Sequence, residues 1–321
     1  MSSNRTDTAR FGILLGALFL SVLTFPIACT HITVVHHLYV TQANSVMIFP
    51  LTASGNVAPT TTISGANTGL NDAHRSAFDS HGNMYVTNPA GNSVTVYSSG
   101  ASGNAAPTAT IFGVATGLNS PSGIALGSHN NIYVSNSLGN SITVYAPGAT
   151  GNATPTNAIS GGVTGLDFPN GIALDSAGNI YVANEDGNSV TVYAAGATGN
   201  ATPMATITGG NTGIGRPHAV ALDTAGNIYV TGISATGPRV GVFAAGASGN
   251  ATPTATIFGA ATGLDNPNGI ALDSHNNIYV ANADASSVTI YAAGASGNAA
   301  PTATISGAAT GFGTVHGVTV H

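Results

Sequence analysis

The stretch at residues 169–184 reads PNGIALDSAGNIYVAN, and it decides the fold. Two short apolar runs, residues 172–174 and 180–182, flank the turn sequence DSAGN. β-Branched and aromatic residues favour strands. Asp and Gly are residues that tight turns need, Asp for its side-chain hydrogen bonds and Gly for its positive φ. The stretch therefore predicts two antiparallel strands joined by a hairpin turn.

This pattern recurs six times along the chain. A Tyr-Val pair marks each copy at intervals of 46 to 50 residues, at Tyr39, Tyr85, Tyr133, Tyr181, Tyr229 and Tyr279. Each copy adds a strand such as VTVY (190–193) and a short strand centred on Thr-Ile, so each unit holds four strands. A solenoid is the alternative, but four strands and a period near 48 residues favour propeller blades that stack radially. The sequence predicts an all-β, six-bladed β-propeller in one domain, residues 30–321.

The two ends of the chain complement each other. Residues 317–320 copy the GIAL strand with no partner strand after them, and residues 37–40 copy the strand that should follow a GIAL. We expect one blade to take its inner strand from the C-terminus and its other three strands from the N-terminus. This pairing of the terminal strands closes the ring and removes an open sheet edge.

The first 29 residues differ from the repeats. Arg5 and Arg10 precede an apolar run at 11–28, and Cys29 follows. A basic start, an apolar middle and a small residue before a break predict an export signal. The segment PIAC resembles a bacterial lipoprotein processing site, which makes Cys29 the lipidated residue. Ordinary cleavage to a secreted or periplasmic protein and an uncleaved apolar anchor are the alternatives. We expect membrane contact only through this N-terminal anchor.

Composition excludes some partners. The net charge is −6 and only 5% of residues are charged, with no basic cluster. Nucleic-acid binding needs a basic footprint, so we expect no nucleic-acid partner. Cys29 is the only cysteine, so it forms no intramolecular disulfide. We expect a monomer.

The stretch at 169–184 and its copy at 267–282 resemble the NHL repeat, and the resemblance covers residues 34–321. It implies a six-bladed propeller of the gluconolactonase-like and TolB-like superfamily. Related propellers include protein-interaction modules, gluconolactonase-like metal hydrolases and a zinc-dependent amidating lyase. The resemblance therefore implies a fold and does not single out an activity.

Departures from the repeat gather on one face of the expected ring. The turns that follow the GIAL and VTVY strands lie on one face of the ring, which we call the turn face. The loops that follow the IYV and ATI strands lie on the other face, which we call the loop face. The turn-face aspartates, Asp79, Asp175, Asp223 and Asp273, are expected to stabilise their hairpins. The charged candidates for binding on the loop face are Arg75, Glu185, Asp186, Arg216 and Arg239. We expect this face to bind a protein, a glycan or a small molecule.

The residue before each GIAL-type strand is polar in all six units. These residues should converge at the mouth of the central channel, and they are His74, Ser122, Asn170, His218, Asn268 and His316. Neutral imidazole is a common zinc ligand, so His74, His218 and His316 are candidate ligands of a divalent metal, zinc or calcium. The alternative is that they hold water and cap backbone groups.

Two functions remain open on this sequence. The first is an exported binding or scaffolding module at the cell envelope. The alternative is a lactonase-like metal-dependent hydrolase or lyase at the channel mouth. No Asp or Glu occupies the six mouth positions, and Glu185 is expected to lie farther out, so a general base is missing. The first function is therefore favoured, and no catalytic residue is assigned.

Overall fold

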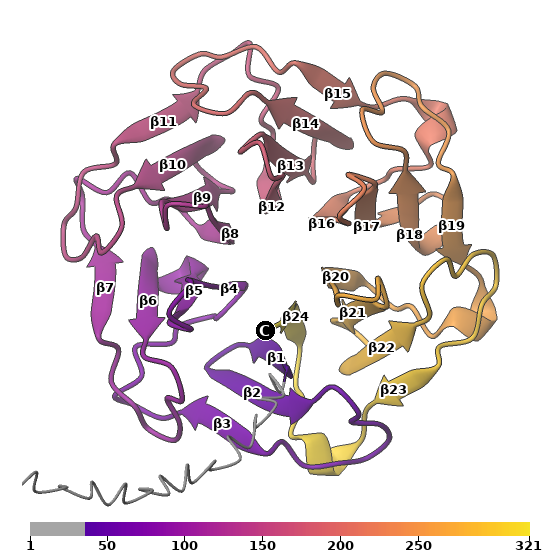
Figure 1. The fold of residues 1–321 in the computed structure, drawn as a ribbon, viewed down its shortest axis with the longest axis horizontal. Helices are drawn as coiled ribbons and strands as arrows, with labels where there is room; N and C mark the ends of the chain where they lie inside the picture. Colours follow the sequence, from indigo (N-terminus) through magenta and orange to yellow (C-terminus); the bar gives the residue numbers. More distant parts are fainter. Residues whose placement is uncertain (1–35) are drawn as a thin grey trace, which may run out of the picture. The chain divides into compact units, whose positions relative to one another are not determined.

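The computed structural model describes residues 36–321. Cys29 and the rest of the predicted export signal lie outside this range. The described residues form six four-stranded antiparallel sheets arranged as a ring (Figure 1), which confirms the six-bladed β-propeller. Between residues 36 and 321, no helix is long and apolar enough to cross a membrane.

Each blade runs from an inner strand at the channel to an outer strand. The first blade holds β24 (Val315–Val320), β1 (His37–Gln42), β2 (Ser45–Pro50) and β3 (Thr61–Ser64). The second holds β4 (Ser76–Phe78), β5 (Met84–Asn88), β6 (Ser93–Tyr97) and β7 (Ala109–Phe112). The third holds β8 (Pro121–Leu126), β9 (Ile132–Asn136), β10 (Ser141–Tyr145) and β11 (Asn157–Ser160). The fourth holds β12 (Pro169–Leu174), β13 (Ile180–Asn184), β14 (Ser189–Tyr193) and β15 (Ala205–Ile207). The fifth holds β16 (Pro217–Leu222), β17 (Ile228–Ser234), β18 (Gly237–Phe243) and β19 (Ala255–Phe258). The sixth holds β20 (Pro267–Leu272), β21 (Ile278–Asn282), β22 (Ser287–Tyr291) and β23 (Ala303–Ile305).

The two ends of the described chain close the ring. β24 pairs antiparallel with β1, with Leu38 opposite Val320 and Val40 opposite Val318. One blade therefore takes its inner strand from the C-terminus, as predicted. Figure 1 shows β24 and β1 side by side within this blade.

The turn aspartates hold their hairpins. Asp175 Oδ1 accepts hydrogen bonds from the backbone N–H of Ala177 and Asn179 at 2.9 and 2.8 Å, and its Oδ2 accepts one from Asn179 Nδ2 at 2.8 Å. Gly178 in the same turn has a φ of +84°, which glycine adopts at little cost. The expected hairpin role of Asp175 is confirmed, and its repeat equivalents make the same contacts.

The core lies between neighbouring blades. Apolar strand residues of adjacent sheets form shared clusters; one joins Tyr85 and Val94 of the second blade to Ile132 and Val134 of the third. The Tyr that ends the third strand is fully buried in four blades, and its hydroxyl donates to a loop carbonyl, as from Tyr193 to the Thr164 oxygen at 2.6 Å. These contacts fix each sheet against the next.

An outer loop, with the sequence GAxGN in five blades and TASGN (52–56) in the first, joins each blade to the one before it. Asn104 Oδ1 accepts a hydrogen bond from the backbone N–H of Asn67 at 2.8 Å, and Gly103 forms a parallel bridge with Ile63. The same bridge recurs at all six junctions, including Gly55 with Ile305 across the closure. The loop, for which the sequence indicated no activity, therefore clamps neighbouring blades together.

Candidate functional site

A cavity of about 300 Å³ occupies the loop-face end of the central channel. All six predicted mouth residues line it, namely His74, Ser122, Asn170, His218, Asn268 and His316. The inner strands bring them together because each residue lies within two positions of the start of its blade's inner strand.

Two further positions of the repeat also line the mouth cavity. One lies two residues before each mouth residue and contributes Asp72, Ser120, Phe168, Arg216 and Asn266. The other lies fifteen residues after each mouth residue, at or just beyond the end of the second strand, and contributes Pro89, Ser137, Glu185 and Ile233. The chemistry at these positions changes from blade to blade, whereas the strands around them are near copies.

The backbone at the first of these positions is strained. The φ values of Asp72, Ser120, Phe168, Arg216 and Asn266 are +63°, +54°, +51°, +38° and +50°. This left-handed region costs a residue with a side chain about 1–2 kcal/mol, with Asn and Asp the most tolerant. Asn side chains of the preceding blade support the conformation: Asn140 Oδ1 accepts from the N–H of Phe168 at 2.8 Å, and Asn188 Oδ1 from that of Arg216 at 2.9 Å. Phe168 and Arg216 thus occupy backbone positions that glycine would fill more easily.

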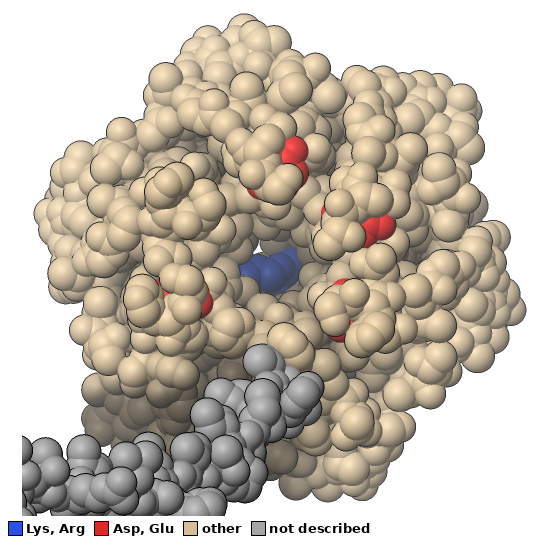
Figure 2. Space-filling model, viewed as in Figure 1, with Lys and Arg blue, Asp and Glu red and all other residues tan. Residues whose placement is uncertain are grey.

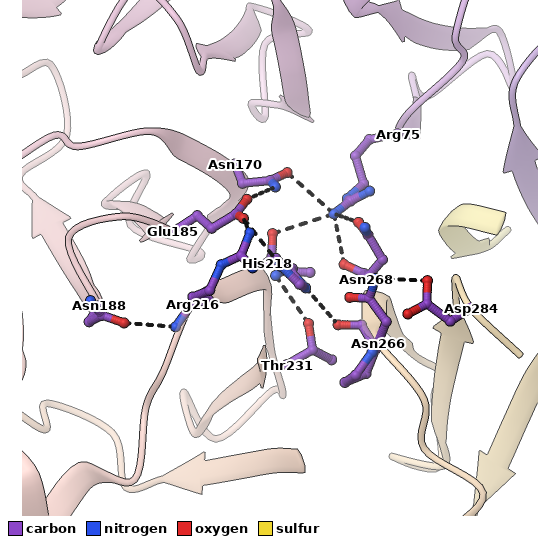
Figure 3. A network of polar contacts seen from close by, with 12 residues as sticks. Arg75, Asn170, Glu185, Asn188, Arg216, His218, Thr231, Asn266, Asn268 and Asp284 are labelled. Carbon is purple, nitrogen blue, oxygen red and sulfur yellow. Dashed lines mark hydrogen bonds and ion pairs between the residues drawn. The ribbon is translucent and has the colours of Figure 1, made fainter. Parts of the chain in front are cut away.

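Arg75 lies inside the channel and not on the open loop face. The residue is only 8% exposed. Its Nη1 donates to the His316 carbonyl at 2.6 Å, and its Nη2 donates to the carbonyl and side-chain oxygens of Asn268 at 2.7 and 2.8 Å. Longer contacts of 3.4 Å reach Asn170 Oδ1 and the His218 carbonyl (Figure 3). One guanidinium therefore ties together the inner strands of several blades beneath the mouth.

Glu185 lies at the mouth, and the expectation that it lies farther out is wrong. It is 7% exposed and forms an ion pair with Arg216. Asn170 Nδ2 donates to its Oε2 at 3.1 Å, and His218 Nε2 lies 3.6 Å from its Oε1 (Figure 3). Burial raises the pKa of Glu185, but contacts with His218, Arg216 and Asn170 outweigh it and lower the pKa to about 2. The carboxylate is therefore charged and fully engaged at neutral pH.

His74 of the second blade and His316 of the first blade form a pair, across the mouth from Glu185 of the fourth blade. Their ring centroids are 4.6 Å apart, and the Nδ1 atom of each is buried without a hydrogen-bond partner. Burial and then the charge of Arg75 lower the pKa of both imidazoles, that of His74 well below its ordinary value. Asp72, 3.6 Å from His316 Nε2, opposes the shift of His316. Both rings are therefore neutral at neutral pH.

The predicted metal ligands do not form one cluster. His218 Nδ1 lies 3.2 Å from the Pro267 carbonyl and its Nε2 faces Glu185, apart from the His74–His316 pair. Within residues 36–321, no group of three or more His, Cys, Asp or Glu side chains is arranged to hold a metal ion. The side-chain oxygens of Asn170 and Asn268 already accept from the Arg75 guanidinium. These donors as placed do not fit zinc or calcium, and metal analysis of the purified protein tests the metal site that the sequence suggested.

The remaining candidates divide between mouth and periphery. Ser122 Oγ donates to Ser137 Oγ at 3.2 Å within the mouth lining. Arg216, with a side chain 60% exposed, stands at the rim. Asp186 is exposed outside the lining, and Arg239 lies on β18, where its guanidinium bonds Thr236 and is 5.9 Å from the Phe258 ring. From the sequence we did not expect Phe168 or Glu185 at the mouth. The repeat nevertheless marks both positions, because Phe168 lies at a fixed distance before the GIAL strand and Glu185 at a fixed distance after the repeat Tyr.

Solved structures share the propeller fold at low sequence identity. A chain of a nidogen/laminin complex is 19% identical, with 89% of this chain and 98% of that one covered and a TM-score of 0.63. A putative 6-phosphogluconolactonase from Bacteroides fragilis is 15% identical over 89% and 84% of the two chains, with a TM-score of 0.60. A streptogramin B lyase is 16% identical over 88% and 83%, with a TM-score of 0.51. A search of curated protein sequences found no match.

Family profiles give a closer assignment. A β-propeller repeat profile matches residues 255–281. The profile of the SMP-30/gluconolactonase/LRE-like region matches residues 20–197, more than half of the sequence. With the six-bladed ring and the polar cavity at its channel mouth, this match means that the chain belongs to the SMP-30/gluconolactonase/LRE-like family.

Proposed function

We propose that this protein is a binding module that takes a small polar ligand into its channel-mouth cavity. The observation that carries the proposal is the strained backbone of Phe168 and Arg216 at the cavity. Left-handed residues other than glycine persist only where the surrounding structure holds them, and they cluster at ligand sites. Here the strain serves to direct an aromatic ring and a guanidinium group to the mouth.

The size of the cavity favours a small ligand. At about 300 Å³ it lies at the lower end of small-molecule pockets, so it takes a single small ring or the end of a glycan chain. Phe168 offers an apolar surface, and the exposed guanidinium of Arg216, held by Glu185, offers a planar polar group beside it. An apolar ring face edged by hydroxyl groups matches this combination.

Binding accounts for the polar groups better than catalysis does. Glu185, the only carboxylate buried at the mouth, is engaged by Arg216, Asn170 and His218 and has a pKa of about 2, so it is a weak proton acceptor. Family membership favours a second candidate, a lactonase-like hydrolase or lyase acting at the same mouth. That candidate needs a metal or a base that the present donors do not supply as placed.

The N-terminal sequence supports a place at the cell envelope. Its basic start, apolar run and Cys29 are the features on which export and lipid attachment rest. Membrane fractionation of cells that express the wild-type chain or Cys29→Ser tests this point. The wild-type protein is expected in the membrane fraction and the variant in the soluble exported fraction; equal membrane retention would contradict lipid attachment.

The binding proposal is tested with a panel of monosaccharides, sugar lactones and small amides in calorimetry. We expect saturable binding that Phe168→Gly and Arg216→Gly abolish, because each removes a mouth side chain. Ser286→Gly is the matched control: Ser286 also has a positive φ, +47°, but does not line the cavity. Binding that survives in both mouth variants, or that falls equally in the control, would overturn the proposal, as would the absence of binding across the panel.

A further inference from the structure

The central channel contains a second cavity on the other side of Arg75. It has a volume of about 160 Å³ and lies between Arg75 and the turn face. Its lining comes from the inner strands and includes Ile124, Ile172, Val220 and Ile270, with Ser76 and Thr319 as the hydroxyl-bearing residues. Figure 2 views the ring from the turn face and shows a basic side chain inside the central opening. This lower channel is therefore a narrow tube, lined by apolar side chains together with polar groups of the inner strands, that ends at a guanidinium.

Arg75 carries a buried positive charge without a counter-ion. Every group that accepts a hydrogen bond from it is a neutral carbonyl or amide oxygen. The ion pairs among residues 36–321 join Glu185 to Arg216 and His218, and Asp72 to His316; none includes Arg75. Its Nε atom is buried and has no hydrogen-bond partner. Proteins rarely leave a buried charge unpaired, because the loss of its hydration is costly.

The guanidinium remains a cation at neutral pH. Burial lowers the pKa of Arg75 to about 10, and the Glu185 carboxylate opposes this shift. The lower channel thus ends at a fixed positive charge whose carbonyl partners come from the mouth side, where the inner strands begin. Since no carboxylate of the described residues pairs with Arg75, this end of the channel is suited to bind an anion.

We propose that the lower channel binds a small monocarboxylate, with its carboxylate paired to Arg75 and its short aliphatic tail along the isoleucine and valine side chains. Guanidinium and carboxylate attract each other strongly, and the Nε–H is the one donor group of Arg75 that has no partner within residues 36–321. An apolar cavity of about 150 Å³ holds a molecule the size of benzene, so a chain of about four to six carbons fits. The site is separate from the mouth cavity and does not rest on the function proposed there.

The turn face sets a limit on the charge of this ligand. Asp79, Asp175, Asp223 and Asp273 lie in the turns around the opening, and their carboxylates are held by their own hairpins. Their repulsion grows with the charge of an approaching anion, so a singly charged anion is favoured over a dianion. Salt screens this repulsion, and binding is expected to become faster as ionic strength rises.

The test uses butyrate and its neutral analogue butyramide in calorimetry and thermal melts of the purified protein, in a buffer without other carboxylates. We expect butyrate to bind saturably at one site and to raise the Tm, and butyramide to bind at least about tenfold more weakly, which corresponds to about 1.4 kcal/mol. Equal binding of the two molecules, or no binding of butyrate, would overturn the proposal. Chloride that protects as well as butyrate would overturn the role of the tail.

Two variants separate the site from general stability. Arg75→Gln removes the charge and should abolish butyrate binding, but it also loosens the channel. Ala271→Leu leaves Arg75 intact and fills the apolar lining, so it should weaken butyrate at least about tenfold while formate, which has no tail, binds as before. The exposed Met204→Ala is the control and should leave both anions unchanged. Unchanged butyrate binding in Ala271→Leu would contradict the proposed location.

Discussion

The Arg75 guanidinium donates two hydrogen bonds to one residue, Asn268, at 2.7 Å to its carbonyl oxygen and 2.8 Å to its side-chain oxygen. Asn268 lies in β20 of the sixth blade and Arg75 just before β4 of the second, so the contact crosses the channel. A third strong bond, to the His316 carbonyl, reaches the first blade. Arg75 therefore connects the second blade to the first and sixth blades across the channel, and it separates the mouth cavity from the lower channel.

Arg75→Met should destabilise the protein strongly. The variant keeps much of the side-chain volume but leaves half-buried oxygens of Asn268 and His316 without these donors, each at a cost of up to about 1–3 kcal/mol. We expect a loss of about 2–4 kcal/mol in the free energy of unfolding, measured by urea denaturation. Arg239→Met, which removes an arginine from the periphery, should cost less than about 1 kcal/mol. Equal losses in both variants would mean that Arg75 does not brace the ring.

The inter-blade clamp provides a matched pair of variants. Asn104→Ala removes the side-chain oxygen that accepts from the N–H of Asn67, so the junction of the first two blades loses a hydrogen bond worth about 1 kcal/mol. Asn67→Ala keeps that backbone donor and should change the free energy of unfolding by less than about 0.5 kcal/mol. Urea denaturation of both variants decides, and the reverse order of stability would contradict the clamp.

The repeat predicted the fold and part of the site for a physical reason. Six copies with recurring turn residues, such as Asp175 and Gly178, define the blades, and the unpaired strand copies at the two ends define the closure. The residues before GIAL could be placed at the mouth because an inner strand has only one start. These features depend on local sequence and on strand alternation alone.

The other mouth residues depend on information that the local pattern lacks. Phe168 and Arg216 take a left-handed backbone that sequence normally signals with Gly or Asn, and the supporting Asn140 and Asn188 come from the preceding blade. Glu185 reaches the mouth because Asn170, His218 and Arg216 hold it there. The repeat marks these positions by a fixed offset, but which offset faces the mouth follows from contacts within and between blades that the assembled ring shows.

Protonation of the mouth histidines should lower stability in mild acid. Burial, followed by the charges of Arg75, His316 and His218, lowers the pKa of His74 well below 6.5. Since the folded-state pKa lies below that of the unfolded chain, the stability that His74 contributes is present above pH 6.5 and is lost as the pH falls toward the folded-state pKa. The Tm of the wild type should therefore drop between pH 7 and pH 5.

His74→Gln tests this origin directly. The variant lacks the titrating ring, so its Tm should fall less between the same two pH values. His129→Gln, at an exposed turn, should behave as the wild type does. If the acid-induced loss of Tm is the same in all three proteins, the histidine pair is not its source.

Deletion of residues 316–321 should abolish the single cooperative unfolding transition. The deletion removes most of β24 and leaves β1 as an open edge that has lost its pairs with Val318 and Val320. Thermal melting should show a lower and broader transition, and an added peptide of the sequence VHGVTVH should restore part of the loss. An unchanged melting curve would refute closure by the terminal strands.

Metal content separates the two candidate functions of the mouth. His218 faces Glu185 away from the His74–His316 pair, and the Asn170 and Asn268 oxygens are taken by Arg75, so we expect tag-free protein to contain no stoichiometric zinc or calcium by mass spectrometry. The double variant His74→Ala/His218→Ala is the comparison. Stoichiometric metal that disappears in this variant would mean that the side chains rearrange around an ion. The hydrolase or lyase would then become the better account, and lactones and esters the substrates to screen. Metal-free protein that binds its ligand through Phe168 and Arg216 would leave the mouth as a recognition site.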